Sequence, residues 1–409
     1  MFNIIYLKQP KSIDTTNIIT MSFFLIPPLH NNNISIDQIN LTSDESNNHK
    51  LSLTLNSYLN NIKKQIDDNY ETWDFVKKYT NPYEFIHTII PNCKNSISKY
   101  KPLSRSFYKM IEISNMLHIF DDFKDEPINT FHLAEGPGGF IEATSYLRKN
   151  ESDKYYGMTL IASDDNNVPG WKKSASFLDT APNVTIEYGV TGTGDLLSVY
   201  NLKYCNDTYG NSMNVITADG GFDFSIDFNK QESLATNLLF AQVSFAIAMQ
   251  KKNGHFVLKI FDIFTKTTSD IIYLLSTLYR QVFIVKPNTS RLANSEKYIV
   301  CKFFKEPQPL LIKKIISEYP KLQTKPFISS LFNFNLDYFY INKIEEYNAI
   351  FGQQQIENIS CTLNLIGCKN KNDKIETFKK NNIQKCIQWC ERNNIPCNKS
   401  IATTNIFLN

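Results

Sequence analysis

A series of short apolar runs, mostly separated by segments long enough for a helix, constrains the fold of this chain more than any other feature. The runs begin at Thr130, Tyr155, Val184, Met213, His255, Gln281 and Lys297. Strands that are apolar along their whole length are typical of a parallel sheet covered by helices on both faces. The last two runs are joined by a short turn-rich stretch, which favours an antiparallel pair at one end of the sheet. The sequence therefore predicts a Rossmann-like α/β fold with a mostly parallel, seven-stranded sheet.

Helical patterns lie before and between these runs. Apolar residues recur at helical spacing over 52–79, which predicts one or two helices, and again over 104–119 and 231–250. Ser104 is a candidate N-cap for the helix at 104–119. By contrast, residues 1 to about 50 mix short apolar runs with a polar stretch rich in turn formers, so we expect an irregular segment there.

The chain beyond about residue 310 is polar and helical in pattern, with no repeat and no low-complexity tract. We therefore expect N-terminal and C-terminal additions to the α/β domain. The three predicted regions are a mixed N-terminal region (1–75), the α/β domain (76–310) and a helical C-terminal region (311–409).

The composition limits what the chain can bind and where it works. Its 409 residues carry a net charge of +3, so contact with a nucleic acid requires a local basic patch. The apolar segment 18–29 is too short to span a bilayer and contains two prolines, so we expect a soluble protein without membrane contact. The eight cysteines are scattered and no secretory signal precedes them, which favours a reduced, intracellular setting.

A glycine-rich turn follows the first of the apolar runs, in the stretch FHLAEGPGGFIEA (131–143). A glycine turn between a strand and a helix predicts a ligand at the carboxyl end of the sheet. The order E-G-P-G-G-F lacks the third glycine of the dinucleotide motif, and Glu135 would repel a phosphate. A cationic ligand would be favoured, and S-adenosylmethionine carries both a sulfonium and an ammonium group. An ordinary tight turn is the alternative.

A second glycine-rich loop, GVTGTGDLLS (189–198), follows the third run. Its glycines allow the backbone to approach a ligand closely, and Asp195 can accept a hydrogen bond from an adenine amino group. Because both loops follow strands of the same sheet, we expect Asp195 at the adenine end of the pocket that begins at Glu135.

Four charged residues come from four segments that should meet at one cleft. They are Lys109, Asp219, Lys259 and Glu296. A ribose 2′-hydroxyl is a weak nucleophile whose proton must be removed or oriented, and a lysine with a lowered pKa can do this. We expect Lys259 to be the base, with Asp219 and Lys109 tuning it and Glu296 holding it. Two structural salt bridges are the alternative interpretation.

The motifs SRSFYKMIEI, AEGPGGF, TADGG, FVLKIF and SRLANSEKYIVC together resemble the FtsJ/RrmJ-like family of RNA ribose 2′-O-methyltransferases, over roughly residues 75–305. The resemblance implies a Rossmann-like methyltransferase fold and places the Lys-Asp-Lys-Glu tetrad of that family on the four charged residues above. It also implies cofactor contacts for a set of residues in the two loops. This set is Glu135, Gly136, Pro137, Gly138, Gly139, Phe140 and Asp195.

The stretch TNPYEFI (80–86) looks like a signature of the cap-specific branch of this family. The resemblance therefore implies methylation of a ribose 2′-hydroxyl near the 5′ cap of mRNA, with capped mRNA as partner and other capping or transcription proteins as further candidates. Ribosomal RNA is the alternative substrate. A dehydrogenase is the rival enzyme class, and a non-catalytic RNA-binding subunit with the same fold is the rival without activity.

The glycine turn departs from the family pattern, because glutamate-glycine-proline stands where many relatives have cysteine-alanine-glycine-proline. This form resembles cap-methyltransferase-like proteins of large DNA viruses, which predicts a viral origin and a location in the host cytoplasm or the virion.

Contacts to RNA and metal need further side chains. Basic and aromatic residues gather ahead of Lys109, and we expect RNA contacts from Lys78, Asn81, Tyr83 and Arg105. The late cysteines lack paired zinc spacing, and no metal is predicted. Five residues instead fit one buried helical face, namely Ile375, Phe378, Ile383, Ile387 and Cys390.

Overall fold

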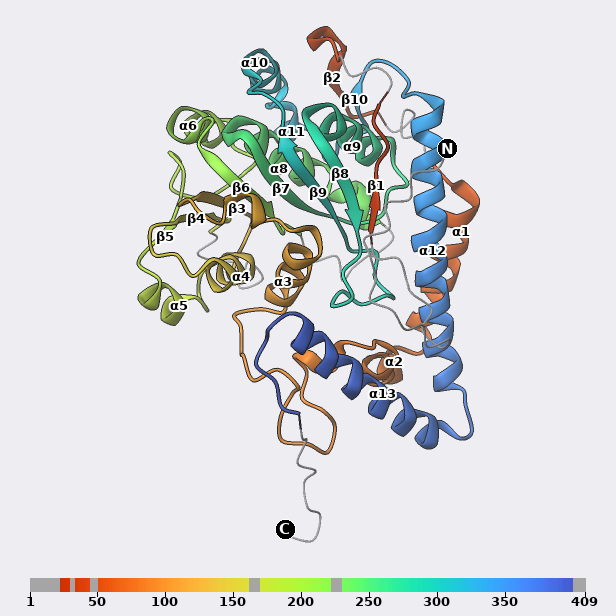
Figure 1. Ribbon diagram of the computed structural model, residues 1–409. Helices are drawn as coiled ribbons and strands as arrows, with labels where there is room; N and C mark the ends of the chain where they lie inside the picture. The colour runs from red at the N-terminus through yellow and green to blue at the C-terminus, as the bar shows by residue number, and fades with distance from the viewer. Residues whose placement is uncertain (1–22, 30–33, 45–50, 162–169, 222–229, 400–409) are drawn as a thin grey trace.

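The computed structural model describes residues 23–29, 34–44, 51–161, 170–221 and 230–399. Their centre is an eight-stranded sheet with the strand order β1-β8-β9-β7-β6-β3-β4-β5 (Figure 1). All seven apolar runs of the sequence form strands of this sheet. The strands are β1 (Phe23–Leu25), β3 (Asn129–Leu133), β4 (Lys154–Met158), β5 (Val184–Ile186), β6 (Met213–Ala218), β7 (Gln250–Ile260), β8 (Tyr279–Val285) and β9 (Lys297–Phe304).

Five neighbouring strands, β7, β6, β3, β4 and β5, pair in parallel, as the apolar pattern predicts. The chain passes from β3 outward through β4 and β5, and then returns to the other side of β3 to form β6. The strand order therefore reverses between β3 and β6. At such a switch point the crossover loops diverge and leave room for a ligand at the carboxyl ends of the strands.

The predicted antiparallel pair of β8 and β9 is confirmed towards one end of the sheet, but the sheet has eight strands and not the predicted seven, because β1 lies beyond the pair. β9 lies between β7 and β8 and runs antiparallel to both. β1 then pairs antiparallel with the outer side of β8, so the expectation of an irregular segment is wrong for Phe23–Leu25. Pairing with β1 covers backbone groups that would otherwise form an open edge. A three-residue strand is too short to show a strand period in the sequence.

Helices cover both faces of the sheet (Figure 1). Alternate residues of β7 face two different apolar cores, with Phe256 and Leu258 in one and Val257 in the other. The first core includes residues of α8, α9 and α10, and the second includes residues of α3, α4 and α13. The helices of the domain are α3 (Ser106–Leu117), α4 (Gly139–Arg148), α5 (Ala175–Thr180), α6 (Val199–Tyr209), α7 (Gln231–Leu234), α8 (Thr236–Met249) and α9 (Lys266–Leu278).

The start of α3 corrects a detail of the sequence analysis. Arg105, not Ser104, is the residue at the N-cap, and no side chain caps the helix. The Ser104 hydroxyl instead hydrogen-bonds the Ser106 hydroxyl, with 2.5 Å between the oxygens. Both hydroxyls lie against Gly139, where an added Cβ would be 2.1–2.3 Å from them. The close approach of α4 therefore turns these serines away from the capping position.

The N-terminal and C-terminal additions pack together along one side of the domain (Figure 1). β2 (Ile39–Thr42) and β10 (Ser330–Phe332) form a separate antiparallel pair. The long helix α12 packs against α1 and α2, while α13 packs against α2 and the short helix η3. The helices of these regions are α1 (Leu53–Asp67), α2 (Tyr70–Thr80), η3 (Glu84–Ile86), α10 (Pro309–Glu318), α11 (Lys321–Thr324), α12 (Tyr338–Ile366) and α13 (Lys371–Arg392), with two further short 3-10 helices, η1 (Ile36–Gln38) and η4 (Asp121–Phe123).

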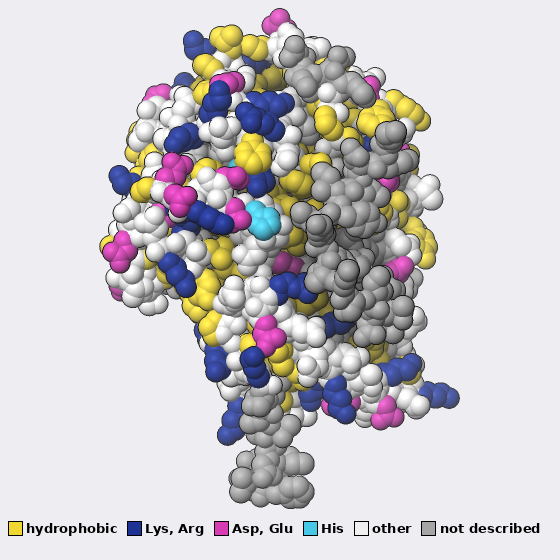
Figure 2. All heavy atoms as spheres, in the orientation of Figure 1, with side chains coloured by type: hydrophobic (Ala, Val, Ile, Leu, Met, Phe, Trp, Pro, Cys, Tyr) yellow, Lys and Arg dark blue, Asp and Glu magenta, His cyan; other side chains and the backbone are white. Residues whose placement is uncertain are grey.

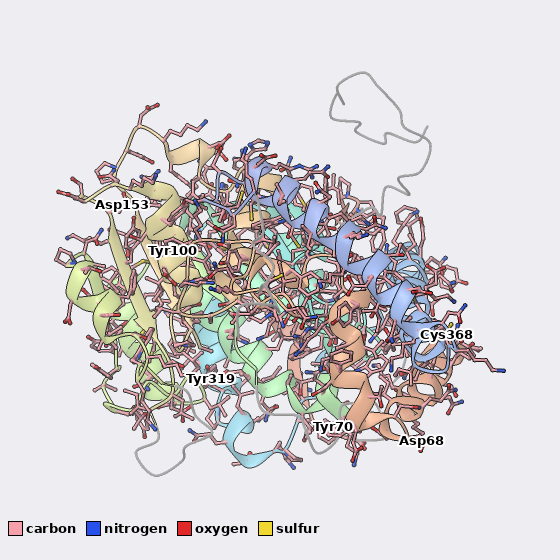
Figure 3. All side chains as sticks on the ribbon, turned by 90° about the horizontal axis from the view of Figure 1, so that it is seen from below. Asp68, Tyr70, Tyr100, Asp153, Tyr319 and Cys368 are labelled. Carbon is pink, nitrogen blue, oxygen red and sulfur yellow. The ribbon has the colours of Figure 1, made fainter. Side chains whose placement is uncertain are left out.

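The C-terminal region shares its cores with the α/β domain. Tyr319, labelled in Figure 3, lies in the first core and donates its hydroxyl hydrogen to the Leu196 carbonyl at 2.6 Å. The expected buried face of α13 is confirmed, because Ile375 and Cys390 lie in the second core. The division of the chain at residues 75 and 310 stays a prediction, since the packing is continuous across both positions. In the part of the chain that the structure describes, no helix is both long and apolar enough to cross a membrane.

Candidate active site

The glycine turn connects β3 to α4 at the switch point of the sheet. Gly138 is the N-cap of α4 with φ of 104°, a conformation that favours glycine. Gly136 is excluded from carrying a side chain for another reason, because an added Cβ would lie 2.5 Å from the Gly170 carbonyl oxygen. Part of the glycine pattern is thus explained by contacts within the protein. The Pro137 carbonyl likewise accepts a hydrogen bond from the Ser174 hydroxyl at 2.5 Å.

Glu135 is almost fully buried, with 3% of its surface exposed. Its Oε1 accepts hydrogen bonds from the backbone N–H groups of Phe140 and Ile141 at the start of α4. Its Oε2 is buried without a hydrogen-bond partner among the described residues. Burial, followed by the charge of Asp219, raises the pKa of Glu135 well above its usual range. A free carboxylate oxygen at this position fits a ligand that supplies a hydrogen-bond donor or a positive charge.

Phe140 has a fully buried side chain whose ring lies 5.9 Å from the ring of Tyr298, between centroids. The predicted cofactor contact of Phe140 can therefore come from its backbone only. Its ring joins the glycine turn to β9, on which Tyr298 lies.

The second loop lies at the carboxyl ends of β4 and β5. Gly194 has φ of 65°, and an added Cβ there would lie 2.0 Å from the Thr159 carbonyl oxygen. The Asp195 Oδ1 accepts a hydrogen bond from the Leu197 N–H at 2.8 Å. Large apolar side chains are exposed around this loop, namely Leu160, Ile161, Tyr188 and Val190. Apolar side chains beside a hydrogen-bonding carboxylate fit the flat ring and amino group of an adenine.

The four charged residues of the predicted tetrad come together at the carboxyl edge of the sheet. Lys109 comes from α3, Asp219 follows β6, Lys259 lies near the end of β7 and Glu296 precedes β9. The Lys109 Nζ lies 2.7 Å from the Glu296 Oε1. The Lys259 Nζ donates to the Asp219 carbonyl at 2.7 Å and lies 3.4 Å from the Asp219 Oδ1. The geometry differs from the sequence interpretation in one respect, because Asp219 rather than Glu296 holds Lys259.

The Tyr298 hydroxyl joins the two ion pairs. It donates to the Asp219 Oδ1 at 3.2 Å and lies 3.5 Å from the Glu296 Oε1. Burial, with the charges of Asp219 and Glu296, raises the pKa of Tyr298 well above its usual range, so the hydroxyl stays protonated. Tyr298 was not predicted from the sequence. The available hint was its position two residues after Glu296, at the start of β9.

The charges around Glu296 keep it ionised. Burial alone would raise the pKa of Glu296, but the positive charges of Lys109 and Lys259 outweigh burial and hold this pKa well below its usual range. A permanently charged carboxylate here orients Lys109 and leaves the Lys259 amine to Asp219 and an incoming substrate.

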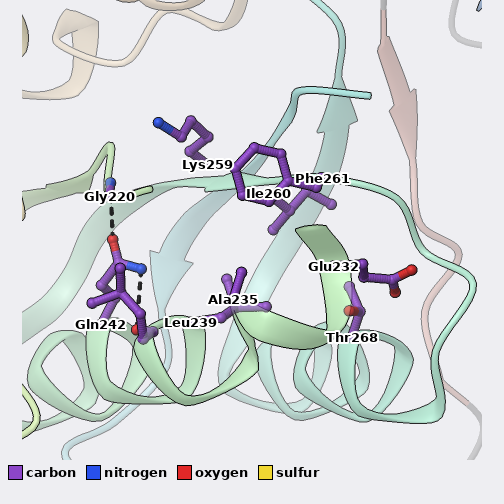
Figure 4. A pocket seen from close by; sticks show the side chains of 10 residues that line it. Gly220, Glu232, Ala235, Leu239, Gln242, Lys259, Ile260, Phe261 and Thr268 are labelled. Carbon is purple, nitrogen blue, oxygen red and sulfur yellow. Dashed lines mark hydrogen bonds between the residues drawn. The ribbon is translucent and has the colours of Figure 1, made fainter. Parts of the chain in front are cut away.

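A small cavity lies behind Lys259, between β7 and α8 (Figure 4). Its volume is about 10 Å³, which suffices for one water molecule and excludes any larger ligand. Gln242 closes one side by accepting a hydrogen bond from the Gly220 N–H at 3.2 Å. On the other side burial, followed by the charge of Asp262, raises the pKa of Glu232 to about 7. Lys259 is one of the residues that line the cavity, and the cavity is too small to be a cofactor site.

The predicted RNA-binding residues differ in how far they are exposed. Lys78 is half-buried on α2, and Tyr83 packs against the second core. Asn81 is buried, and its amide bonds the Lys77 carbonyl at 2.7 Å and the Leu292 N–H at 3.3 Å. Arg105 has a buried Nε without a hydrogen-bond partner among the described residues. Its RNA contact, like those of the other three residues, stays a prediction.

Metal binding has no support in the described ranges. They contain no group of three or more His, Cys, Asp and Glu side chains that could hold an ion.

The reversed strand order, the glycine turn with its free carboxylate oxygen and the exposed apolar side chains at the second loop define a Rossmann-type methyltransferase, a class whose cofactor is S-adenosylmethionine. Comparison with known families is more specific, because residues 102–304 match the FtsJ-like methyltransferase family. Residues 102–304 are thus similar to that family, and the methyltransferase fold predicted from the sequence is confirmed.

Several curated proteins are similar to this chain. Cap-specific mRNA (nucleoside-2'-O-)-methyltransferase 1 of Danio rerio is 34% identical over 224 residues, which cover 50% of this chain and 26% of that protein. The protein of the same description from Mus musculus is 33% identical over 246 residues, covering 55% of this chain and 27% of that protein. Cap-specific mRNA (nucleoside-2'-O-)-methyltransferase 2 of Pongo abelii is 26% identical over 347 residues, covering 82% of this chain and 44% of that protein. The chain thus spans between about a quarter and a half of the length of these relatives.

Among solved structures, a putative ribosomal RNA methyltransferase from Plasmodium falciparum aligns at 21% identity with a TM-score of 0.35, covering 49% of this chain and 97% of that protein.

Proposed function

We propose that this protein methylates a ribose 2′-hydroxyl near the 5′ cap of mRNA, using S-adenosylmethionine as methyl donor. The observation that carries the proposal is the meeting of Lys109, Asp219, Lys259 and Glu296 in one network beside the glycine turn. The curated relatives described above are named as cap-specific mRNA methyltransferases, which supports a capped substrate.

The residues present fit the cofactor. The free Oε2 of Glu135 would accept from its ammonium group. Asp195 and the exposed apolar side chains around it would hold the adenine. The cofactor supplies an electrophilic methyl group on a sulfonium. Every other part of the reaction belongs to the chain's own side chains.

Lys259 is the group that handles the substrate proton. Its amine is held by the carbonyl and carboxylate oxygens of Asp219, which fixes its position and leaves one direction for the 2′-hydroxyl. The Lys259 amine would take up the hydroxyl proton as the 2′-oxygen gains the methyl group and the methyl–sulfur bond breaks, which would leave the cofactor as a neutral thioether. Lys109 lies across the network, and its ion pair with Glu296 keeps it in place.

Contacts to the RNA backbone would come from Arg105, which stands one helical turn before Lys109. The Arg105 Nη2 donates to the Thr289 carbonyl at 3.5 Å, whereas its Nε has no hydrogen-bond partner among the described residues, and an RNA phosphate would complete the guanidinium. Lys78 would add a second phosphate contact from α2. Asn81 and Tyr83 would line the RNA-binding surface between Arg105 and Lys78. Lysine and arginine side chains are otherwise mixed with acidic ones over the visible face of the molecule (Figure 2), which suits a local rather than a global RNA surface.

The decisive experiment is mass spectrometry of short RNAs after incubation with the protein and S-adenosylmethionine. We expect one added methyl group on a ribose near the cap of a capped RNA, and none on the same RNA without a cap. Methylation of a ribosomal RNA fragment in preference to capped RNA would overturn the substrate assignment. Absence of methylation from every RNA, with cofactor binding retained, would favour the non-catalytic subunit.

We also propose that the protein comes from a large DNA virus and works inside the host cell, alongside other capping or transcription proteins. The support is the glutamate-glycine-proline form of the glycine turn and the scattered cysteines. Assignment of the gene to a cellular genome would contradict the viral origin. Recovery of the protein from the secreted fraction of infected cells would contradict the intracellular location.

A further inference from the structure

The helix α12 carries buried amide side chains along the stripe that faces the protein. Most of this stripe is apolar, as Ile344, Phe351 and Ile359 illustrate, but Asn348, Gln355 and Asn358 lie in the same stripe and are 3–8% exposed. Buried amides are costly unless their hydrogen bonds are made, and apolar residues would dock a helix without that cost. The hydrogen-bond partners of these amides are therefore the key to their role.

Each of these amides donates to a backbone carbonyl in a different loop or, for Thr80 at the end of α2, directly before one. Asn348 Nδ2 donates to the Ile263 carbonyl at 2.7 Å, Gln355 Nε2 to the Ala293 carbonyl at 2.9 Å and Asn358 Nδ2 to the Thr80 carbonyl at 2.9 Å. The Thr80 hydroxyl also lies 2.7 Å from the Thr362 hydroxyl, one turn further along α12. We call Asn348, Gln355 and Asn358 the amide ladder. It extends over ten residues of helix, or about 15 Å.

The three loops reached by the amide ladder carry or adjoin the acceptor side of the active site. Ile263 follows β7 four residues after Lys259, and Ala293 precedes Glu296 by three residues. Thr80 begins the TNPYE segment, in which Glu84 forms a bidentate ion pair with Arg291 at 2.6 and 2.9 Å. The ladder therefore reaches the segment that follows Lys259, the loop that carries Glu296 and the segment that begins at Thr80.

The loop between β8 and β9 depends most on such support, because it carries Glu296 and has no regular structure. At its base, the buried Lys286 Nζ donates to the Asn294 carbonyl and side-chain oxygens, each at 2.7 Å, and to the Glu296 carbonyl at 2.8 Å. On its inner side, the Glu112 carboxylate of α3 accepts hydrogen bonds from the backbone and side chains of Asn288 and Thr289. Gln355 holds its outer side, so the loop is fastened from three directions.

We propose that α12 is a positioning element for methyl transfer, in which the amide ladder sets the three acceptor-side loops in register with one another. The proposal rests on the proposed function for its reaction, and it concerns a helix that lies outside the matched family domain of residues 102–304. No member of the ladder touches a reacting atom. Each acts through a backbone carbonyl, and the cofactor side of the site receives no contact from the ladder in the described residues.

The test compares two glutamines of the same helix. Gln355→Met keeps the length of the buried side chain and removes its donor, whereas Gln353→Met changes an exposed residue that bonds only the Glu357 side chain at 2.8 Å. We expect Gln355→Met to lower kcat on capped RNA at least tenfold, with the dissociation constant of S-adenosylmethionine unchanged within twofold. Gln353→Met should match the unaltered protein in both measurements.

Hydrogen exchange of the backbone amides at 287–296 provides a readout that does not need activity. We expect exchange in this loop to be at least tenfold faster in Gln355→Met than in Gln353→Met, at a temperature where both proteins are folded. Unchanged exchange, or a loss of kcat that only follows the folded fraction, would overturn the proposal. If Gln355→Met does not fold, Gln355→Asn takes its place, because it keeps the amide but shortens the side chain. The same loss of kcat and the same faster exchange are expected for this variant. If the unaltered protein does not methylate capped RNA, only the proposed function is overturned. Hydrogen exchange at 287–296 would still show whether the amide ladder holds this loop.

Discussion

The cofactor side and the acceptor side of this active site are built in different ways. On the cofactor side, the binding groups come from turns that directly follow β3 and β5, and close backbone contacts such as that of Gly194 with Thr159 shape them. On the acceptor side, Lys109 and Glu296 are 187 positions apart and meet only through their side chains. The first side is thus a local property of strand-turn-helix units, and the second is a property of the whole fold. Changes on the acceptor side should therefore alter rate or stability, and changes on the cofactor side should alter cofactor affinity.

The largest effect is expected for Lys259. Lys259→Ala should lower methyl transfer by at least about a hundredfold, as for loss of a general base, while cofactor affinity changes little. Lys259→Arg should also be inactive, because a guanidinium does not give up its proton. Methyl transfer and melting temperature are measured on both variants. An active and stable Lys259→Arg protein would show that this residue is only an ion-pair partner.

The next effect concerns the ion pair between Lys109 and Glu296. Glu296→Gln leaves the largely buried Lys109 ammonium without its partner, so the free energy of unfolding should fall by about 3 kcal/mol. Adding Lys109→Met removes the unpaired charge and should recover most of the stability without restoring activity. Chemical denaturation of the two single variants and the double variant measures the coupling. Additive losses of stability would mean that the two side chains do not interact.

A smaller effect is expected on the cofactor side. Glu135→Gln removes the negative charge that this carboxyl group can take up beside an ammonium group, so the affinity for S-adenosylmethionine should fall about tenfold. Asp195→Ala should weaken binding in a similar way while the fold stays intact. Calorimetry measures both. Unchanged affinity in the two variants would show that the cofactor does not contact Glu135 or Asp195.

The smallest effect tests the junction of the two sides, where β3 pairs with β6. His132 lies there fully buried between the hydroxyls of Thr130 and Thr217, and burial lowers its pKa to about 3. Because the unfolded chain binds this proton near pH 6.5, the native state loses stability as the pH falls below that value. Between pH 6.5 and 5.5 the loss should be about 1 kcal/mol from this residue.

Denaturation at several pH values, with His132→Gln as control, measures this loss. Since His87 and His255 are also buried with pKa values of about 3 and about 4, the control should reduce the pH dependence by one proton and not abolish it. An unchanged pH dependence in His132→Gln would contradict the assignment.

The comparison of the two sides also explains what the sequence could predict. The apolar runs and glycine turns are local patterns, so the strands and the identity of the tetrad followed from them and from the family resemblance. The pairing within the tetrad did not, because it depends on which of two nearby carboxylates each lysine reaches. Tyr298, Lys286 and Gln355 were missed for a related reason. Each looks like an ordinary strand or helix residue until distant loops are brought beside it.

The strand β1 has a consequence for how this protein could associate with others. It has three residues, and so does β5 at the opposite border of the sheet. Borders this short offer few unpaired backbone groups to a strand from another molecule. Association with another protein would then rely on side-chain surfaces, which can separate and recombine, and not on a sheet that continues from one protein into the next.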